Sequence, residues 1–242
     1  MKMDTLFWLQ RNPKLAVEHT TKKYFGKYLY KLVLYAPASR LIHSKGSIEE
    51  ELQYRKNFNP GGSWRYKNYF ANSADMANVE FLEKMRDLKH DKTLNIKLRA
   101  EEPRIQVYAD NEQDLKHIIN TYLSNYYTQI ETISGPEDAE AEQILNSGAI
   151  LKKNDLGYRY KIILKDGRYD TKIKRQLVEY LENMGADLVR MPRGTHDMLS
   201  KPTGYMWNCY FYSNDERINV FVDLMIPGII SNCHELIIKP HK

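Results

Sequence analysis

Two segments of nearly the same sequence recur 130 residues apart, and this repetition constrains the fold of the 242-residue chain more than any other feature. Residues 28–34 read YLYKLVL and residues 158–164 read YRYKIIL. A second pair follows in the same order, VYADNE at 107–112 and FYSNDE at 211–216, with an offset of 104 residues. Self-similarity that persists over two anchors indicates an internal duplication.

The second offset continues without a gap in our alignment. It pairs Ile118 with Val222, Tyr122 with Ile226, Tyr126 with Ile230, and residues 131–133 with 235–237. The two offsets differ by 26 residues, so the first copy carries about that much additional chain between its anchors. Residues 54–72 lie in that interval, and we interpret them as an insertion.

The hydrophobic periodicities predict the same order of elements in both copies. For the second copy we expect a strand at 158–165, a helix at 170–184, a short strand at 187–191, a loop rich in Pro and Gly, an aromatic strand at 205–212, a helix capped by Asn214 and a strand at 234–238. For the first copy we expect strands near 28–36, 93–99, 104–109 and 131–134, and helices near 47–58, 74–90 and 112–129. The order β-α-β-β-α-β is that of a ferredoxin-like unit.

We therefore predict an α+β chain that contains two tandem ferredoxin-like units from an internal duplication. The expected parts are a basic helical segment at 1–27, the first unit at 28–134 with its insertion near 54–72, an acidic linker helix at 135–157 and the second unit at 158–242. The linker contains the stretch PEDAEAE, whose carboxylates suit the first turn of a helix.

One face of each predicted sheet should be free of helices, because a ferredoxin-like unit packs both helices on the other face. Strand alternation places Leu32, Leu34, Ile105 and Val107 inward in the first unit, and Ile162, Leu164, Cys209 and Phe211 inward in the second. The free faces should then be basic and tyrosine-bearing, with hardly an acid. The residues expected there are Lys31, Lys97, Arg99, Arg104 and Tyr108 in the first unit, and Arg159, Lys161, Arg190, Tyr210 and Tyr212 in the second.

The insertion has the same chemistry as the expected sheet faces. Residues 54–70 read YRKNFNPGGSWRYKNYF, with six aromatic residues, four cations and no acid around a Pro-Gly-Gly turn. We expect a binding arm, although these rings could instead pack on their own domain as a small satellite core. The candidate residues of the arm are Arg55, Lys56, Trp64, Arg65, Tyr66 and Lys67.

Motifs that carry enzyme chemistry are absent from the sequence. It contains no phosphate-binding Gly-rich loop, HExxH, CxxC or nucleophile elbow, and no carboxylate cluster at metal spacing, so we expect neither a cofactor nor a metal. His43 and His196 remain weak candidates for acid–base catalysis, each in a basic loop. Arg193, in the same loop as His196, is a further candidate for nucleic-acid binding. We expect Cys209 and Cys233 to be small buried residues that lie too far apart to form a disulfide.

This order of elements resembles the tandem RRM-like architecture of RNA-binding proteins and of CRISPR repeat-processing endoribonucleases. The resemblance spans roughly residues 28–240. The chain lacks the C-terminal glycine-rich loop of those endoribonucleases and the aromatic signature of the RRM, so no catalytic residue is carried over from either family.

Cations beside aromatic rings are what a surface that binds single strands requires, since the cations contact phosphates and the rings stack on bases. We therefore predict a protein that binds RNA or single-stranded DNA. One alternative is a structural or assembly protein, such as a viral one, in which residues 54–72 bind a protein partner or a second copy. A further alternative is a metal-independent endoribonuclease.

The apolar run from Leu6 to Leu9 is too short for a signal peptide or a membrane span. We therefore expect no membrane partner and a cytoplasmic location, in the host cytoplasm if the protein is viral.

Overall fold

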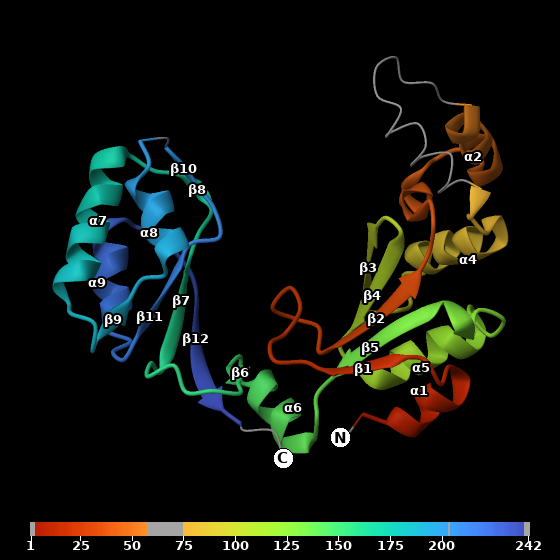
Figure 1. Cartoon of the computed structure of the whole chain (residues 1–242), viewed down its shortest axis with the longest axis horizontal. Coiled ribbons are helices and arrows are strands. Elements are labelled where there is room, and N and C mark those ends of the chain that lie inside the picture. Colours follow the sequence, from red (N-terminus) through yellow and green to blue (C-terminus); the bar gives the residue numbers. More distant parts are fainter. Residues whose placement is uncertain (1–2, 58–74, 203, 240–242) are drawn as a thin grey trace. The chain divides into compact units, whose positions relative to one another are not determined.

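The computed structural model describes residues 3–57, 75–202 and 204–239. The chain divides into two compact units, with the boundary between Glu142 and Gln143. Each unit contains a five-stranded mixed sheet accompanied by helices, so the fold class is α+β (Figure 1). Within the described ranges, none of the helices has both the length and the apolar character that a membrane crossing requires.

The first unit builds its sheet in the strand order β1-β5-β2-β4-β3. Strand β2 is central, β1 runs parallel to β5, and the other neighbours are antiparallel. The elements are α1 (Thr5–Arg11), β1 (Ala16–His19), β2 (Tyr30–Tyr35), the 3-10 helix η1 (Ser39–His43), α2 (Ile48–Asn57), α4 (Val79–His90), β3 (Ile96–Glu101), β4 (Arg104–Ala109), α5 (Glu112–Thr121), the 3-10 helix η2 (Tyr127–Gln129) and β5 (Ile130–Gly135).

The second unit has the strand order β6-β12-β7-β11-β9, again with a parallel edge pair, β6 and β12. Strand β7 is central, between β11 and β12. The elements that begin with the boundary helix are α6 (Ala139–Asn146), β6 (Ile150–Lys152), β7 (Tyr160–Leu164), β8 (Gly167–Arg168), α7 (Thr171–Asn183), β9 (Val189–Arg190), α8 (Arg193–Ser200), β10 (Tyr205–Met206), β11 (Tyr210–Ser213), α9 (Ile218–Met225) and β12 (Ile230–Ile238).

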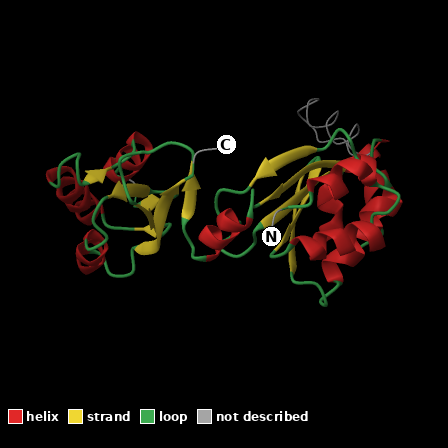
Figure 2. Ribbon diagram, turned by 90° about the horizontal axis from the view of Figure 1, so that it is seen from below, coloured by secondary structure: helices red, strands yellow, loops and turns green. Residues whose placement is uncertain are grey.

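The core of each unit lies between the sheet and the helices on one of its faces (Figure 2). All eight residues expected to point inward are buried, with at most 1% of their surface exposed. In the second unit, Ile162 and Phe211 share a cluster with Leu177 of α7 and Val222 of α9. The alternation of apolar residues therefore identified the covered face of both sheets correctly.

The central strand and its β4 or β11 neighbour have the same register in both sheets. Lys31 lies opposite Tyr108 in the first unit, and Lys161 lies opposite Tyr212 in the second. These pairs are related by the two sequence offsets of 130 and 104 residues. The repetition in the sequence thus coincides with a repetition of the hydrogen-bonded register.

The ungapped alignment is wrong over the last strand. Leu32 lies opposite Ile133, whereas Ile162 lies opposite Cys233, so Cys233 and not Ile237 occupies the register position of Ile133. The offset of 104 holds up to Tyr122 and Ile226, which cap α5 and α9 at their C-termini. Beyond these caps the chain reaches its strand four residues sooner in the second unit.

Several sequence expectations in the second unit need correction. Residues 193–200 form α8 where we expected a loop, and the aromatic strand is interrupted at Asn208, whose φ is 50°. Asn214 does not cap a helix, because α9 starts only at Ile218. Its side chain instead accepts a hydrogen bond from the Arg159 backbone N–H and donates to the carbonyl oxygens of Gly157 and Asp187.

Two segments that we expected to be helical contribute edge strands as well. Residues 16–19 form β1 beside β5, and residues 150–152 form β6 beside β12. The helix expected at 112–129 ends at Thr121. Both cysteines are free thiols, but Cys233 is exposed, so the expectation of two buried cysteines holds only for Cys209.

Candidate nucleic-acid interface and a basic pocket

The open face of the second sheet carries three tyrosine rings, of which Tyr158 and Tyr210 both contact Tyr212. Tyr158 stacks on Tyr212 with ring centroids 6.1 Å apart, and Tyr210 meets Tyr212 edge-on at 5.5 Å. The Lys161 ammonium lies 3.8 Å from the centroid of Tyr210. The exposed Arg190 is the β9 neighbour of Tyr212. This face therefore combines cations with partly exposed rings, as the sequence predicts.

The open face of the first sheet is partly covered by the chain that leads into β2. Tyr24, Phe25 and Tyr28 lie over Tyr108, with ring centroids 5.3, 4.9 and 6.4 Å from that of Tyr108. Tyr108 is therefore buried, at 4% exposure, and the expectation that it lies on an accessible face is wrong. Burial also raises the pKa of its hydroxyl group.

Phe25 is the accessible ring on this face, and our sequence reading missed it. Its side chain is 49% exposed, and the Lys97 ammonium lies 3.5 Å from its centroid. Phe25 and Gly26 form the centre of a tight turn with φ values of 54° and 69°, closed by a hydrogen bond from the Lys27 N–H to the Tyr24 carbonyl. A left-handed aromatic residue stores strain of about 1 kcal/mol or more. The signal in the sequence was an aromatic–Gly turn between lysines, KKYFGKY at 22–28.

Acidic side chains accompany the expected cations, contrary to the expectation of faces with hardly an acid. Four cations on or beside the sheets have a carboxylate partner: Lys31 with Glu18 at 3.8 Å, Arg99 with Glu101, Arg104 with Glu131, and Arg159 with Glu235 at 3.1 Å. The hydrogen bond to Glu235 raises the pKa of Arg159. Lys97 and Lys161 contact aromatic rings on the open faces, and Arg190 is the strand neighbour of Tyr212.

The candidate arm lies mostly outside the described residues, including Trp64, Arg65, Tyr66 and Lys67. Its two described cations are in ion pairs, Arg55 with Glu102 at 3.4 Å and Lys56 with Asp75 at 3.1 Å. Glu102 has a side chain only 5% exposed. Arg55 therefore holds the end of α2 to the turn between β3 and β4.

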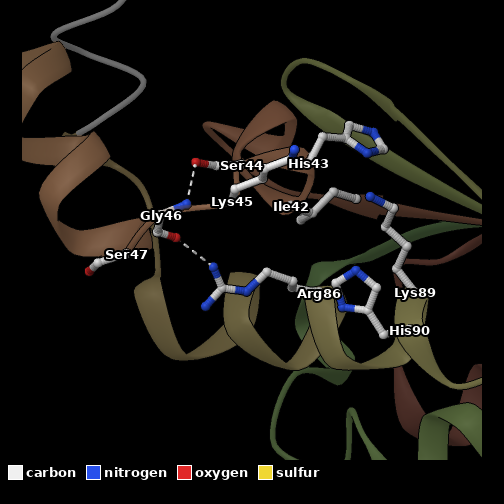
Figure 3. A pocket seen from close by; sticks show the side chains of 9 residues that line it. All are labelled: Ile42, His43, Ser44, Lys45, Gly46, Ser47, Arg86, Lys89 and His90. Atoms are coloured by element: carbon white, nitrogen blue, oxygen red, sulfur yellow. Dashed lines mark hydrogen bonds between the residues drawn. The ribbon is translucent and has the colours of Figure 1, made fainter.

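A basic pocket of about 550 Å³ lies in the first unit between α4 and residues 42–47, which end η1 and lead into α2 and are called the η1 turn below (Figure 3). Side chains of the two segments face one another across it, and the described residues that line it include no acid. Arg86 is 23% exposed and donates to the Gly46 carbonyl oxygen at 2.9 Å. The basic residues that line the pocket are His43, Lys45, Arg86, Lys89 and His90.

Two carboxylates adjoin this pocket without lining it. Glu83 lies 4.0 Å from Arg86, and Glu51 accepts a hydrogen bond from Ser44. Burial, and then the charge of Lys89, lowers the pKa of His43. His43 thus lies in a positive environment.

The two candidate histidines have different surroundings. His196 lies on α8 with carboxylates as neighbours, its Nε2 3.3 Å from Glu182 and its Nδ1 3.8 Å from Asp197. Arg193 is 95% exposed and pairs with the same Asp197 at 3.9 Å. His43, in contrast, lines the basic pocket. Across residues 3–57, 75–202 and 204–239, no group of three or more His, Cys, Asp or Glu side chains could hold a metal ion.

Comparisons with known proteins do not extend this description. No family model matches the chain, and neither the curated proteins nor the solved structures give a significant match.

Proposed function

We propose that the chain binds RNA or single-stranded DNA through the open faces of its two sheets. The observation that carries this proposal is the repeated pair of a lysine opposite a tyrosine, Lys31 with Tyr108 and Lys161 with Tyr212, each surrounded by further rings and cations. Ammonium groups can contact the phosphates while neighbouring rings stack on the bases, and this combination tolerates any base sequence.

We propose further that the two units are ferredoxin-like copies of one ancestral unit. Without their parallel edge strands, both sheets have the order of strands 4-1-3-2 expected for β-α-β-β-α-β. The shared register supports this interpretation. A break in the strand register at the same place in both sheets also supports it. Glu131 of β5 and Ser231 of β12 each have no partner residue in the central strand. The resemblance to tandem RRM-like proteins is consistent with the proposed use of the open face.

The two faces would use different rings. In the second unit Tyr210 and Tyr212 are half-buried and lie on the sheet itself. In the first unit Tyr108 supports Phe25, which is the ring that a base could reach. Strain in a turn residue is often retained where the residue has a function, which supports a role for Phe25.

The charge of the second sheet face can be tested with a matched pair of double variants. Lys161→Gln with Arg190→Gln removes two charges from the open face, whereas Lys172→Gln with Arg175→Gln removes two exposed charges from α7 on the covered side. We expect only the first variant to weaken binding of a single-stranded oligonucleotide. Its slope of log affinity against log salt should fall by about 1 for each lost phosphate contact.

Fluorescence anisotropy at several salt concentrations measures the affinity of each double variant for the oligonucleotide and the dependence of that affinity on salt. Equal effects of the two double variants would show that net charge alone, and not the open face, attracts the strand.

The role of Phe25 can be separated from its contribution to folding. Asn adopts left-handed backbone readily, so Phe25→Asn removes the ring without breaking the turn. We expect affinity for a single strand to fall about 5- to 150-fold, which corresponds to one lost stacking interaction of about 1 to 3 kcal/mol. The melting temperature should change little. Unchanged affinity in this variant would mean that Phe25 only covers Tyr108.

A further inference from the structure

We propose that the basic pocket between the η1 turn and α4 binds a phosphate monoester group. Five basic side chains reach it from two elements that are far apart in the sequence, His43 and Lys45 from the η1 turn and Arg86, Lys89 and His90 from α4. A phosphate monoester carries up to two negative charges and three strong acceptor oxygens, so it matches converging donors of this kind. This inference does not depend on the proposed function of the sheet faces.

Helix stability does not account for the composition of this pocket. Lys89 and His90 lie in the last turn of α4, where cations interact favourably with the helix dipole. Lys45 belongs to another element, however, and Arg86 precedes the last turn. Charges of one sign that converge without a carboxylate among the lining residues repel one another, and an anion relieves this repulsion.

Arg86 is already held in place for such a ligand. The guanidinium group donates one hydrogen bond to the Gly46 carbonyl and lies 4.0 Å from Glu83, which leaves further N–H groups for a ligand. A donor whose position is fixed before binding loses little conformational entropy when the ligand arrives. Ser44 is also oriented, because its hydroxyl accepts from the Gly46 N–H and donates to Glu51.

The pocket has room for a ligand that is larger than a phosphate group alone. About 550 Å³ lies within the range of sites for small organic ligands. The ligand could therefore be a free mononucleotide or the terminal nucleotide of a strand, which present the same chemical group.

Calorimetric titration of the full chain with inorganic phosphate, and then with adenosine monophosphate and adenosine, tests the inference directly. We expect both phosphates to bind and adenosine to bind much more weakly. Lys89→Gln should reduce phosphate affinity about ten-fold or more, whereas Lys92→Gln, which removes an exposed charge just beyond the same helix end, should have little effect. Absence of phosphate binding, or equal effects of the two substitutions, would overturn the proposal.

Sulfate allows the contribution of His43 to be measured, because it stays doubly charged over the range in which histidine titrates. His43 lines the pocket with Lys45, Arg86 and Lys89, and the carboxylates nearest to it are Glu51 and Glu83. We expect sulfate affinity to rise as the pH falls from about 8 to about 5.5, because His43 gains a proton. The rise should be smaller in His43→Gln. Affinity of the unaltered chain that does not change with pH would exclude His43 from the site.

Oligonucleotides of one sequence with a 5′-phosphate or a 5′-hydroxyl group distinguish the two sources of the ligand. A gain in affinity from the 5′-phosphate that Lys89→Gln abolishes identifies the end of a strand. Binding of the mononucleotide without such a gain identifies a free nucleotide. The Lys161→Gln and Arg190→Gln variant should still bind inorganic phosphate, so failure of the sheet-face proposal and failure of this one give different results.

Discussion

The Glu112 carboxylate is buried at the start of α5 and connects it to the N-terminal helix. Its Oε1 accepts a hydrogen bond of 2.8 Å from the indole N–H of Trp8, which is itself fully buried. The Asp4 backbone N–H donates to both carboxylate oxygens. Lys116 lies 3.7 Å from Glu112 and 2.9 Å from Asp4, and its hydrogen bond lowers the pKa of Asp4. One buried acid thus organises the contact between α1 and α5.

Replacement of this acid should destabilise the first unit. Glu112→Ala leaves the Trp8 indole and the Asp4 N–H without their acceptor, and each unsatisfied buried donor costs about 1 to 3 kcal/mol. We expect the free energy of unfolding to fall by about 2 to 4 kcal/mol, since Asp4 is near the surface and can recover a bond to water. Urea denaturation measures this loss. Gln113→Ala, on the exposed side of the same turn, is the control and should change stability by less than about 0.5 kcal/mol.

At the scale of a single element, α9 has two apolar faces, of which the core covers one. Ile218 and Val222 are buried, whereas Val220, Phe221 and Leu224 are exposed at 60%, 55% and 72%. From its sequence alone, a helix with apolar residues on both of these faces would be expected to be buried on all sides. Only the position of α9 against the sheet decides which of its faces contributes to stability.

Two alanine substitutions on α9 should therefore have unequal effects although both remove aliphatic groups. Val222→Ala opens a small cavity in the core, and we expect a loss of about 2 kcal/mol in the free energy of unfolding. Leu224→Ala removes an exposed side chain, so stability should change by less than about 0.5 kcal/mol. Thermal denaturation of both variants checks the expectation. A loss of similar size in each would show that something covers Leu224.

At the scale of the whole molecule, each unit has an interior of its own. The cluster of buried residues that fills the second unit lies between Ile162 and Ile229, all beyond the boundary at Gln143. Its edge strand β6 also belongs to that part of the chain. A unit of about 100 residues with a continuous core is within the usual size of an independent domain.

The second unit should accordingly fold without the first. We expect a fragment of residues 136–242, which retains all of α6, to unfold in one cooperative transition and to give dispersed amide resonances. The salt-dependent binding of single strands should persist in it at reduced affinity, because the open face with Lys161 and Tyr212 is intact. A fragment with the spectrum of an unfolded chain would show that the units depend on each other.

The sequence by itself determined the features that depend on local periodicity. Alternation within a strand is set by the pleat, so Leu32 and Ile162 could be assigned to the covered face without knowledge of their neighbours. The two offsets relate the pair Lys31 and Tyr108 to the pair Lys161 and Tyr212, because a repeated sequence repeats its register.

The tertiary structure alone decided the features that depend on contacts between distant segments. No periodicity in the sequence indicates that Tyr24, Phe25 and Tyr28 cover Tyr108, that Glu131 pairs with Arg104, or that the edge strands β1 and β6 join the sheets. The basic pocket also depends on such contacts, since Lys45 and Lys89 lie 44 residues apart in the sequence and line one pocket only because η1 packs on α4. Side-chain direction follows from the local backbone, whereas burial, ion pairing and the convergence of like charges depend on which surfaces the folded chain brings together.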